Sequence, residues 1–373
     1  MRQSSILLVV GTRPEAIKFA PLADVLVARG HRVQVAVTGQ HPQLDLAAFG
    51  FGKVDLLRLC CPAGSDPQAH AEGVASTLAP LLRSGRRPDL VLVQGDTSSA
   101  LGGALGAQAA GVPLAHVEAG LRSHDLTLPW PEEGNRLAID AQADLLFAAT
   151  EGNAANLRAE GVGGEIHVTG NTAIDALFGL LETLPPRLLD SGGLPRLLVT
   201  CHRRENWGTA FAPIALALLD LARSPWLRIE VVLHSNPAMA DAARLLLGGQ
   251  PRLRLLPPMD HRAMVGAMRS ARVLLSDSGG IQEEAPALGV PLLILRTKTE
   301  RPEGIASGNS LLVGADRHVI VREASRLLTE QSAYRSMAVP ALPFGDGRAS
   351  ERIAQHVEDW LVRHDRRRAR QIA

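Results

Sequence analysis

The sequence has few residues that cross-link a chain or bind a metal. It contains three cysteines among 373 residues, and two of them, Cys60 and Cys61, are adjacent. Three cysteines cannot build a disulfide framework, and an adjacent pair lacks the spacing of a metal site. No histidine and cysteine stand at the spacing of zinc ligands. We therefore expect neither a structural disulfide nor a metal.

Long apolar runs and an excess of one charge are also missing. No apolar segment approaches the roughly 20 residues of a membrane-spanning helix, and the run at 6–10 is too short for the core of a signal peptide. The 39 basic and 38 acidic residues leave a formal net charge of +1. This balance gives no reason to expect a nucleic acid or a membrane as the partner. We expect a cytoplasmic protein.

What the sequence does contain is an alternation of short apolar runs and helical stretches. Hydrophobic residues make up 46% of the 373 residues, which is typical of a globular protein with room for two domains. Such alternation favours an α/β fold with parallel sheets. The expected strands form two series, first 5–10, 33–38, 90–94, 114–117, 145–149 and 166–169, then 197–200, 229–234, 253–256, 272–275, 291–295 and 310–313.

A stretch rich in proline and glycine at 184–195 separates the two series and is typical of a hinge. We therefore predict two Rossmann-like domains, 1–185 and 186–350, with a cleft at the carboxyl ends of both sheets. Residues 351–373 are expected to form a C-terminal helix and basic tail. The apolar stripe of this helix predicts that it packs on one of the two domains.

The most informative stretch is SDSGGIQEEAP at 276–286. It follows an apolar run typical of a buried strand, and it places Gly279 and Gly280 before the start of a helix. Glycines let the backbone approach a ligand, and the free N–H groups of a helix start favour an anion. Glu284, one turn later, can accept hydrogen bonds from ribose hydroxyls. The stretch suits a nucleotide diphosphate, and an ordinary strand-to-helix turn is the alternative.

Carboxylates follow two other predicted strands. If the strands at 90–94 and 114–117 are neighbours, Asp96 and Glu118 lie close together and their pKa values are driven apart. The alternative is that one of them caps a helix. Glu132 and Arg136 are four residues apart and share a helical face, so they can form an ion pair. The alternative is that Glu132 is a third carboxylate for acid–base chemistry.

Basic residues also follow predicted strands, where they can contact a phosphate or carboxylate. Arg13 and Lys18 lie beyond the first strand, and Arg301 follows the strand at 291–295. His202 and His234 follow corresponding strands of the second series. A lone histidine is more often structural than catalytic, but two at corresponding strand ends favour contact with a ligand.

Nine stretches resemble the non-hydrolysing UDP-N-acetylglucosamine 2-epimerases in order and spacing. They are GTRPEAIK (11–18), TGQH (38–41), GDT (95–97), HVEAGLRS (116–123), PWPEE followed by NR (129–136), TGN (169–171), HRRE (202–205), SDSGGIQEEAP (276–286) and TERPE (299–303). The resemblance spans nearly the whole chain. It implies a GT-B-like fold, a cytoplasmic homodimer and a UDP-sugar substrate, with no cofactor and no required metal.

The resemblance also implies roles for individual residues. The implied catalytic residues are Asp96, Glu118, Glu132 and His202. The implied substrate-binding residues are Arg13, Lys18, Arg136, His234, Ser278, Gly279, Gly280, Glu284 and Arg301. A second, activating UDP-N-acetylglucosamine binds a Gln-His-Arg stretch in bacterial members, which makes Gln40 and His41 candidates for an allosteric site.

The implied reaction interconverts UDP-N-acetylglucosamine and UDP-N-acetylmannosamine for bacterial cell-surface polysaccharides. UDP leaves first, which gives C1 oxocarbenium character and makes the C2 proton removable, with 2-acetamidoglucal as the intermediate. Cations and backbone N–H groups would stabilise the departing diphosphate, and carboxylates would act near C2. The alternatives are a hydrolysing 2-epimerase, a 2-epimerase of a UDP-diacetamido sugar, a GT-B glycosyltransferase and a non-catalytic UDP-sugar sensor.

Three positions depart from the family pattern. Cys201 stands where the family usually has glycine. Met264 lies in the segment at 258–264, where an aromatic residue usually packs on the uracil. Pro42 follows Gln40 and His41 in place of the usual arginine, so one cation of the allosteric site is missing.

Overall fold

The chain divides into two compact units. The computed structural model describes residues 3–42, 44–85, 87–185, 193–203, 206 and 210–372, without the side chains of residue 53 and residues 367–372. Unit 1 comprises Met1–Ala176 and Phe344–Ala373, and unit 2 comprises Leu177–Pro343. Most of the predicted hinge, residues 186–192, lies outside the described residues. HRRE is described only as far as its first arginine, because residues 204 and 205 also lie outside them.

Unit 1 is built on a seven-stranded parallel sheet with the strand order β3-β2-β1-β4-β5-β6-β7. Along β1, Ile6, Leu8 and Val10 face one apolar core, and Leu7 and Val9 face the other. Both faces are therefore covered, as in most parallel sheets. The strands are β1 (Ser5–Val10), β2 (Arg32–Val37), β3 (Asp55–Arg58), β4 (Leu90–Gln94), β5 (Leu114–Ala119), β6 (Leu145–Ala148) and β7 (Glu165–Val168).

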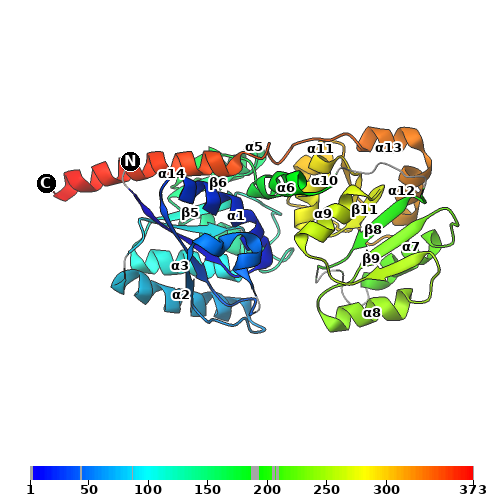
Figure 1. Ribbon diagram of the computed structural model, residues 1–373, viewed down its shortest axis with the longest axis horizontal. Helices are drawn as coiled ribbons and strands as arrows, with labels where there is room; N and C mark the ends of the chain where they lie inside the picture. Colours follow the sequence, from blue (N-terminus) through cyan, green and yellow to red (C-terminus); the bar gives the residue numbers. More distant parts are fainter. Residues whose placement is uncertain are drawn as a thin grey trace. The chain divides into compact units, whose positions relative to one another are not determined.

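Helices cover the two faces of this sheet. One core contains residues of α1 and α14, and the other contains residues of α2 and α3, as Figure 1 shows. Several helices begin with a side-chain cap, for example α3 at Thr97 and α5 at Thr150. The helices are α1 (Arg13–Ala28), α2 (Pro67–Ser84), α3 (Ser98–Ala110), α4 (Glu132–Asp140), α5 (Glu151–Glu160), α6 (Thr172–Thr183) and α14 (Ala349–Ile372), with short 3-10 turns η1 (Leu46–Phe49) and η2 (Phe51–Lys53).

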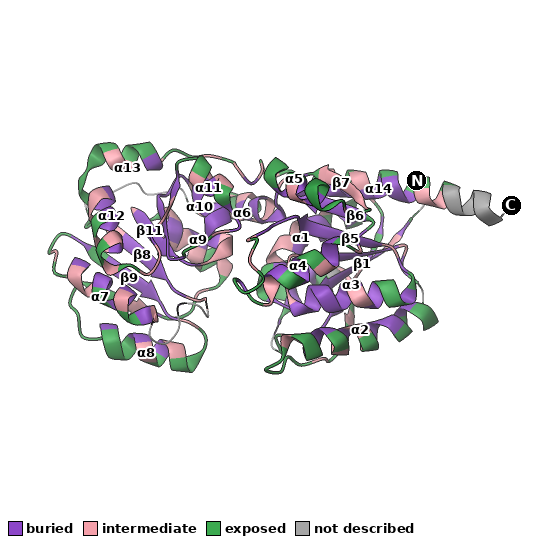
Figure 2. Cartoon of the chain, turned by 180° about the vertical axis from the view of Figure 1, so that it is seen from behind, coloured by how far each residue is buried: buried purple, intermediate pink, exposed green. Residues whose placement is uncertain are grey.

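Unit 2 has a six-stranded parallel sheet with the order β10-β9-β8-β11-β12-β13. Its strands are β8 (Arg196–Thr200), β9 (Arg228–Val232), β10 (Leu253–Leu256), β11 (Val273–Ser276), β12 (Leu292–Ile294) and β13 (Ser310–Leu312). Its helices are α7 (Phe211–Leu221), α8 (Pro237–Leu247), α9 (His261–Arg269), α10 (Gly279–Leu288), α11 (Pro302–Ala306), α12 (Arg317–Thr329) and α13 (Gln331–Met337). The buried strands and the exposed outer faces of α2 and α8 are visible in Figure 2.

The boundaries of the units differ from the predicted ones for a packing reason. The second half of α6 is apolar, and Leu177, Phe178 and Leu181 pack in the core of unit 2. Unit 2 therefore begins at Leu177 instead of residue 186. Residues 344–350, predicted for the second domain, belong to unit 1.

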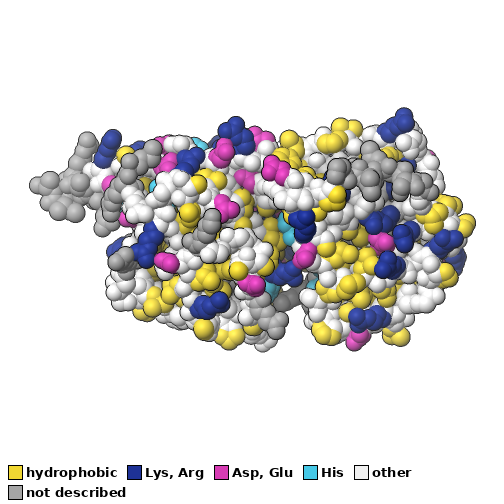
Figure 3. Space-filling view, viewed as in Figure 1, with side chains coloured by type: hydrophobic (Ala, Val, Ile, Leu, Met, Phe, Trp, Pro, Cys, Tyr) yellow, Lys and Arg dark blue, Asp and Glu magenta, His cyan; other side chains and the backbone are white. Residues whose placement is uncertain are grey.

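The C-terminal helix α14 is part of the core of unit 1. Its residues Ile353, Ala354 and Val357 are fully buried there. The predicted apolar stripe thus packs on unit 1. The segment predicted as a tail continues as helix to Ile372. No helix in the described ranges is long and apolar enough to cross a membrane. Acidic and basic side chains are scattered over the visible face in Figure 3, in keeping with the balanced composition.

Candidate active site

Asp96 and Glu118 lie at the carboxyl ends of neighbouring strands. β4 pairs with β5 in parallel, with Gln94 opposite Val117, which confirms the adjacency on which the prediction depended. Glu118 has a φ angle of 70°, a left-handed conformation that is uncommon for residues other than glycine. The pairing of β5 with β6 shifts register between Val117 and Ala119. Glu118 therefore occupies a β-bulge, a feature that re-aims side chains next to functional sites.

Each of these two carboxylates has its own cation. Lys18, on α1, places its Nζ 2.5 Å from Glu118 Oε2, which also accepts a hydrogen bond of 2.6 Å from Gln94. Arg136, on α4, donates from Nε and Nη2 to Asp96 Oδ2 at 2.9 and 2.6 Å. Each of the two carboxylates thus has a positive charge within hydrogen-bond distance.

Helix α4 supplies a further support for Asp96. Asn135 donates from its side chain to the backbone oxygen of Asp96 at 2.8 Å. The buried carboxylate of Glu133 accepts from Arg136 Nη1 at 2.9 Å and from the backbone N–H groups of Ser123 and His124. Glu133, which no sequence pattern singled out, thus connects α4 to the preceding loop. Glu132, the predicted third carboxylate, opens the same helix.

The turn after β1 is held by a buried carboxylate. Glu15 accepts hydrogen bonds from the backbone N–H groups of Gly11 and Thr12 and from the hydroxyl of Thr97. Burial raises the pKa of Glu15, although these hydrogen bonds oppose the rise. This carboxylate thus connects the Arg13 turn to the loop of Asp96, with Arg13 itself exposed.

The candidates for an allosteric site lie near the same turn. Gln40 accepts a hydrogen bond of 2.6 Å from the Ser99 hydroxyl, and the backbone N–H of His41 donates to Gly11. Burial and the positive charge of Arg13 lower the pKa of His41. Gln40, His41 and Arg13 are thus neighbours in unit 1, as their positions after β1 and β2 imply.

In unit 2, a helix follows β11 as predicted, but it begins at Gly279, two residues earlier than the sequence indicated. Ser278 is the N-cap of α10 and makes no side-chain capping bond, and Gly279 and Gly280 are the first two residues of the helix. Arg301 lies against this start, because a Cβ added at Gly279 would be 3.0 Å from its Nη1. Two carboxylates hold Arg301, Glu283 at 2.7 Å and Glu300. A fixed guanidinium therefore stands beside the N–H groups of a helix start, an arrangement that suits a phosphate.

The two predicted histidines of unit 2 contact each other. The rings of His202 and His234 meet edge to face with centroids 5.1 Å apart. Burial lowers the pKa of His234, and the neighbouring His202 adds to the effect. Among the described residues, the buried Nε2 of His202 has no hydrogen-bond partner. This atom is available to a ligand.

The fully buried Asp277 holds the loop that carries His202. Its carboxylate accepts from the backbone N–H groups of His202 and Arg203 at 2.8 Å and from the Asn206 side chain at 2.9 Å. The sequence placed Asp277 within a motif but offered no role for it. A charged residue directly after a buried strand was the signal that could have revealed one.

Glu284 has a partner that the sequence did not suggest. His261, at the start of α9, places its Nε2 2.6 Å from Glu284 Oε1. Burial opposes the charge of His261, but the hydrogen bond and the charge of Glu284 outweigh it and raise the pKa of His261. His261 lies in the 258–264 segment, where the resemblance leads one to look for an aromatic residue. Met264, in the same segment, packs partly buried against the apolar core beside α10.

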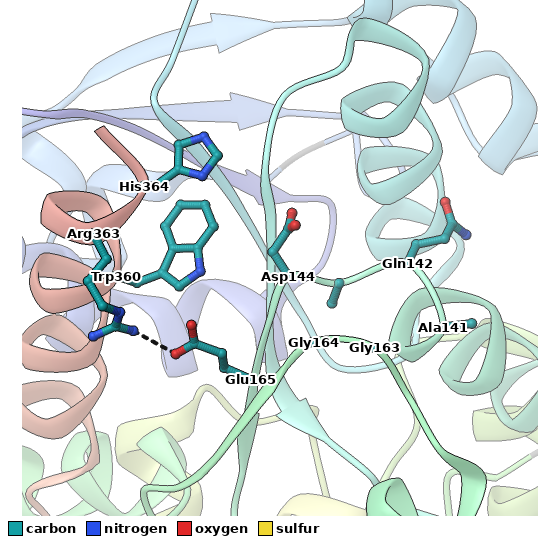
Figure 4. A pocket seen from close by; sticks show the side chains of 10 residues that line it. Ala141, Gln142, Asp144, Gly163, Gly164, Glu165, Trp360, Arg363 and His364 are labelled. Carbon is teal, nitrogen blue, oxygen red and sulfur yellow. Dashed lines mark hydrogen bonds and ion pairs between the residues drawn. The ribbon is translucent and has the colours of Figure 1, made fainter. Parts of the chain in front are cut away.

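The carboxylates and the Gly-Gly turn thus each lie at the carboxyl end of a parallel sheet. A cavity of about 380 Å³ lies elsewhere, at the amino-terminal ends of β6 and β7, where Asp144, Glu165, Trp360 and Arg363 line it (Figure 4). The cavity therefore lies at the amino-terminal ends of the strands of unit 1, whereas Asp96 and Glu118 lie at the carboxyl ends. Within the described ranges, no three His, Cys, Asp or Glu side chains gather as metal ligands would.

Two parallel α/β units with polar groups at their strand ends define a GT-B-like protein. The sequence profile of the UDP-N-acetylglucosamine 2-epimerase family matches residues 26–358. The chain belongs to this family. The UDP-N-acetylglucosamine 2-epimerase of Salmonella typhimurium is 39% identical over 374 residues, which cover 96% of this chain and 99% of the relative. The enzyme of that name from Escherichia coli K12 is 38% identical, with coverages of 95% and 98%.

Solved structures give the same assignment of fold. The UDP-GlcNAc 2-epimerase of Neisseria meningitidis, bound to UDP-GlcNAc, superposes with a TM-score of 0.87 at 34% identity, covering 95% of this chain and 100% of the other. S. aureus MnaA, solved with UDP, has a TM-score of 0.87 at 36% identity and coverages of 96% and 97%. The predicted GT-B-like fold is confirmed.

Proposed function

We propose that this protein epimerises UDP-N-acetylglucosamine at C2 to UDP-N-acetylmannosamine without net hydrolysis. The observation that carries the proposal is the pair of carboxylates at the ends of β4 and β5, each ion-paired, in a chain of this family. The relatives named above carry the same activity in their names. The GTRPEAIK and PWPEE stretches resemble the non-hydrolysing branch.

Unit 2 would hold UDP as a leaving group. The N–H groups at the start of α10, the guanidinium of Arg301 and the ring of His202 would stabilise the negative charge that develops on the diphosphate. Glu284 would accept hydrogen bonds from the ribose, with His261 fixing its carboxylate. These groups favour cleavage of the anomeric C–O bond, whose electron pair leaves with UDP.

The carboxylates of unit 1 would then act at C2. One of Asp96, Glu118 and Glu132 takes the C2 proton, and the C–H electron pair forms the C1=C2 double bond of 2-acetamidoglucal. Protonation of C2 from the opposite face and attack of the diphosphate oxygen on C1 reverse the elimination with inverted C2. No electron is gained or lost overall. A cytoplasmic homodimer that serves bacterial surface polysaccharides stays a prediction from the family resemblance.

The test is proton NMR of the purified protein with UDP-N-acetylglucosamine in D₂O. We expect a growing UDP-N-acetylmannosamine signal, with deuterium entering at C2. Free N-acetylmannosamine plus UDP would instead assign the protein to the hydrolysing branch. An unchanged spectrum, also with added UDP-N-acetylmannosamine as substrate, would contradict the proposal.

A further inference from the structure

A chain of hydrogen-bonded polar side chains lies next to the two carboxylates. His116 is on β5, two residues before Glu118, and is fully buried. Its Nδ1 lies 2.6 Å from Asp140 Oδ1, and its Nε2 lies 2.8 Å from the backbone oxygen of Gly95. A carboxylate and a carbonyl oxygen both accept hydrogen bonds. Nε2 of His116 therefore donates to the Gly95 carbonyl, and Nδ1 shares a hydrogen bond with the Asp140 carboxylate.

The second oxygen of Asp140 is equally occupied. Asp140 Oδ2 accepts from the backbone N–H of Gly120 at 3.2 Å and from Arg122 Nη2 at 2.7 Å. Arg122 continues the chain to Glu160, with contacts of 2.7 and 2.6 Å. Burial alone would raise the pKa of Asp140, but the charges and hydrogen bonds of His116 and Arg122 outweigh it and lower that pKa. Asp140 is thus a carboxylate held in its charged form between His116 and Arg122.

This chain of hydrogen-bonded side chains holds the backbone on both sides of the site. His116 holds the carbonyl of Gly95, the residue directly before Asp96. Asp140 holds the N–H of Gly120, two residues after Glu118. Both ties converge on one imidazole–carboxylate pair, so a change in the pair reaches both carboxylates.

The backbone after Glu118 needs such a constraint. Glu118 adopts its left-handed conformation at a β-bulge, and a conformation of this kind persists only where the surroundings enforce it. Gly120 has a φ angle of 80°, and a Cβ added there would be 2.3 Å from the backbone oxygen of Asn153. This crowding restricts the backbone conformations of the segment, and the hydrogen bond from Gly120 to Asp140 stabilises the observed one.

We propose that His116 and Asp140 are positioning residues, which set the placement of the Asp96 and Glu118 carboxylates through the backbone of Gly95 and Gly120. This inference rests on the proposed function, because the placement matters only if these carboxylates act on the substrate. Both residues act on the backbone and are not expected to touch the sugar. Their loss therefore lowers kcat and leaves the affinity for UDP unchanged.

Two substitutions of His116 separate its two hydrogen bonds. His116→Asn can keep the donor toward Asp140 but loses the donor toward Gly95. His116→Gln reaches further and can keep the donor toward Gly95. We expect His116→Asn to lower kcat by about 10-fold to 100-fold, the effect of a displacement near 1 Å. We expect His116→Gln to retain the larger share of kcat, with KM and the Kd for UDP within about twofold of the wild type in both.

The matched control is His31→Asn. His31 is also buried in unit 1 and pairs with a carboxylate, Glu358, at 3.1 Å. It precedes β2 and lies at the amino-terminal edge of the sheet, away from Asp96 and Glu118. We expect His31→Asn to lose about as much thermal stability as His116→Asn but to keep the kcat of the wild type. This result would show that the fall in kcat of His116→Asn does not come from lower stability alone.

The assay is the NMR measurement of C2 deuteration and epimerisation, made at a temperature where each variant is folded. If His116→Asn does not fold, Asp140→Asn takes its place with the same expected fall in kcat. If the wild type is active and the folded variant has the same kcat, the inference is wrong and the proposed function is unaffected. A wild type that neither epimerises nor deuterates its substrate overturns the proposed function and the inference together.

Discussion

The two glycines of the SDSGG turn have different surroundings, and this difference predicts opposite results for two alanine substitutions. A Cβ at Gly279 would be 3.0 Å from Arg301 Nη1 and 3.1 Å from its Cζ. Arg301 is held by Glu283 and Glu300, so it cannot move away at little cost. A Cβ at Gly280 would meet no protein atom within 4 Å. The fold therefore requires glycine at 279, and only a ligand would require it at 280.

The expected magnitudes follow from these contacts. Gly279→Ala overpacks the turn and should lower the free energy of unfolding by about 1–3 kcal/mol. Gly280→Ala should leave it unchanged or raise it by up to about 1 kcal/mol, because alanine favours a helix. If the diphosphate lies on the first N–H groups of α10, the new methyl group at 280 collides with it. We then expect the Kd for UDP to rise at least about tenfold, or about 1.4 kcal/mol.

The assay combines thermal unfolding with calorimetric titration of UDP. Gly266→Ala is the control, because Gly266 lies within α9 and a Cβ there also meets nothing within 4 Å. It should reproduce the stability of Gly280→Ala and bind UDP like the wild type. Wild-type UDP affinity in a folded Gly280→Ala variant would refute the reasoning that places the diphosphate on this turn.

Two further predictions concern charged groups. Asp96→Asn and Glu118→Gln should each lower kcat by about 100-fold or more and leave the Kd for UDP unchanged. The control Glu165→Gln, at the amino-terminal end of the sheet, should have the kcat of the wild type. Near-native turnover in both Asp96→Asn and Glu118→Gln would contradict the acid–base assignment. Because the pKa of His261 is raised in the folded protein, its stabilising effect is complete below a pH of about 6.5 and is lost as the pH rises through the folded value. The difference in Tm between the wild type and His261→Gln should therefore shrink as the pH is raised above 6.5, and a difference independent of pH would argue against the pair with Glu284.

The sequence predicted the strands well because buried parallel strands are continuous apolar runs. It missed β3, whose sequence DLLR begins and ends with charged residues and whose side chains are mostly exposed at the sheet edge. The closeness of Asp96 and Glu118 was predicted on the condition that their strands are neighbours, and the sheet order meets this condition. These predictions needed only local patterns and the rule that parallel strands collect their carboxyl ends at one edge.

The partners within the site could not be predicted in this way. Lys18 and Glu118 are 100 residues apart, and Arg136 pairs with Asp96, 40 residues before it, as well as with Glu133 on its own helix. The left-handed backbone of Glu118 has no sequence signal, because glycine is the residue that marks such positions. Partner choice depends on the packed positions of α1 and α4, which no local pattern encodes.

The return of α14 to unit 1 also bears on how the chain is made. Unit 2 is contiguous, whereas unit 1 takes its last core residues, among them Ile353 and Val357, from beyond unit 2. During synthesis the chain emerges from its N-terminal end, so the residues of unit 2 leave the ribosome before those of α14. Until then one face of the unit 1 sheet lacks part of its apolar cover and is open to chaperones or to aggregation. The domain with the candidate acid–base carboxylates is therefore the last to mature.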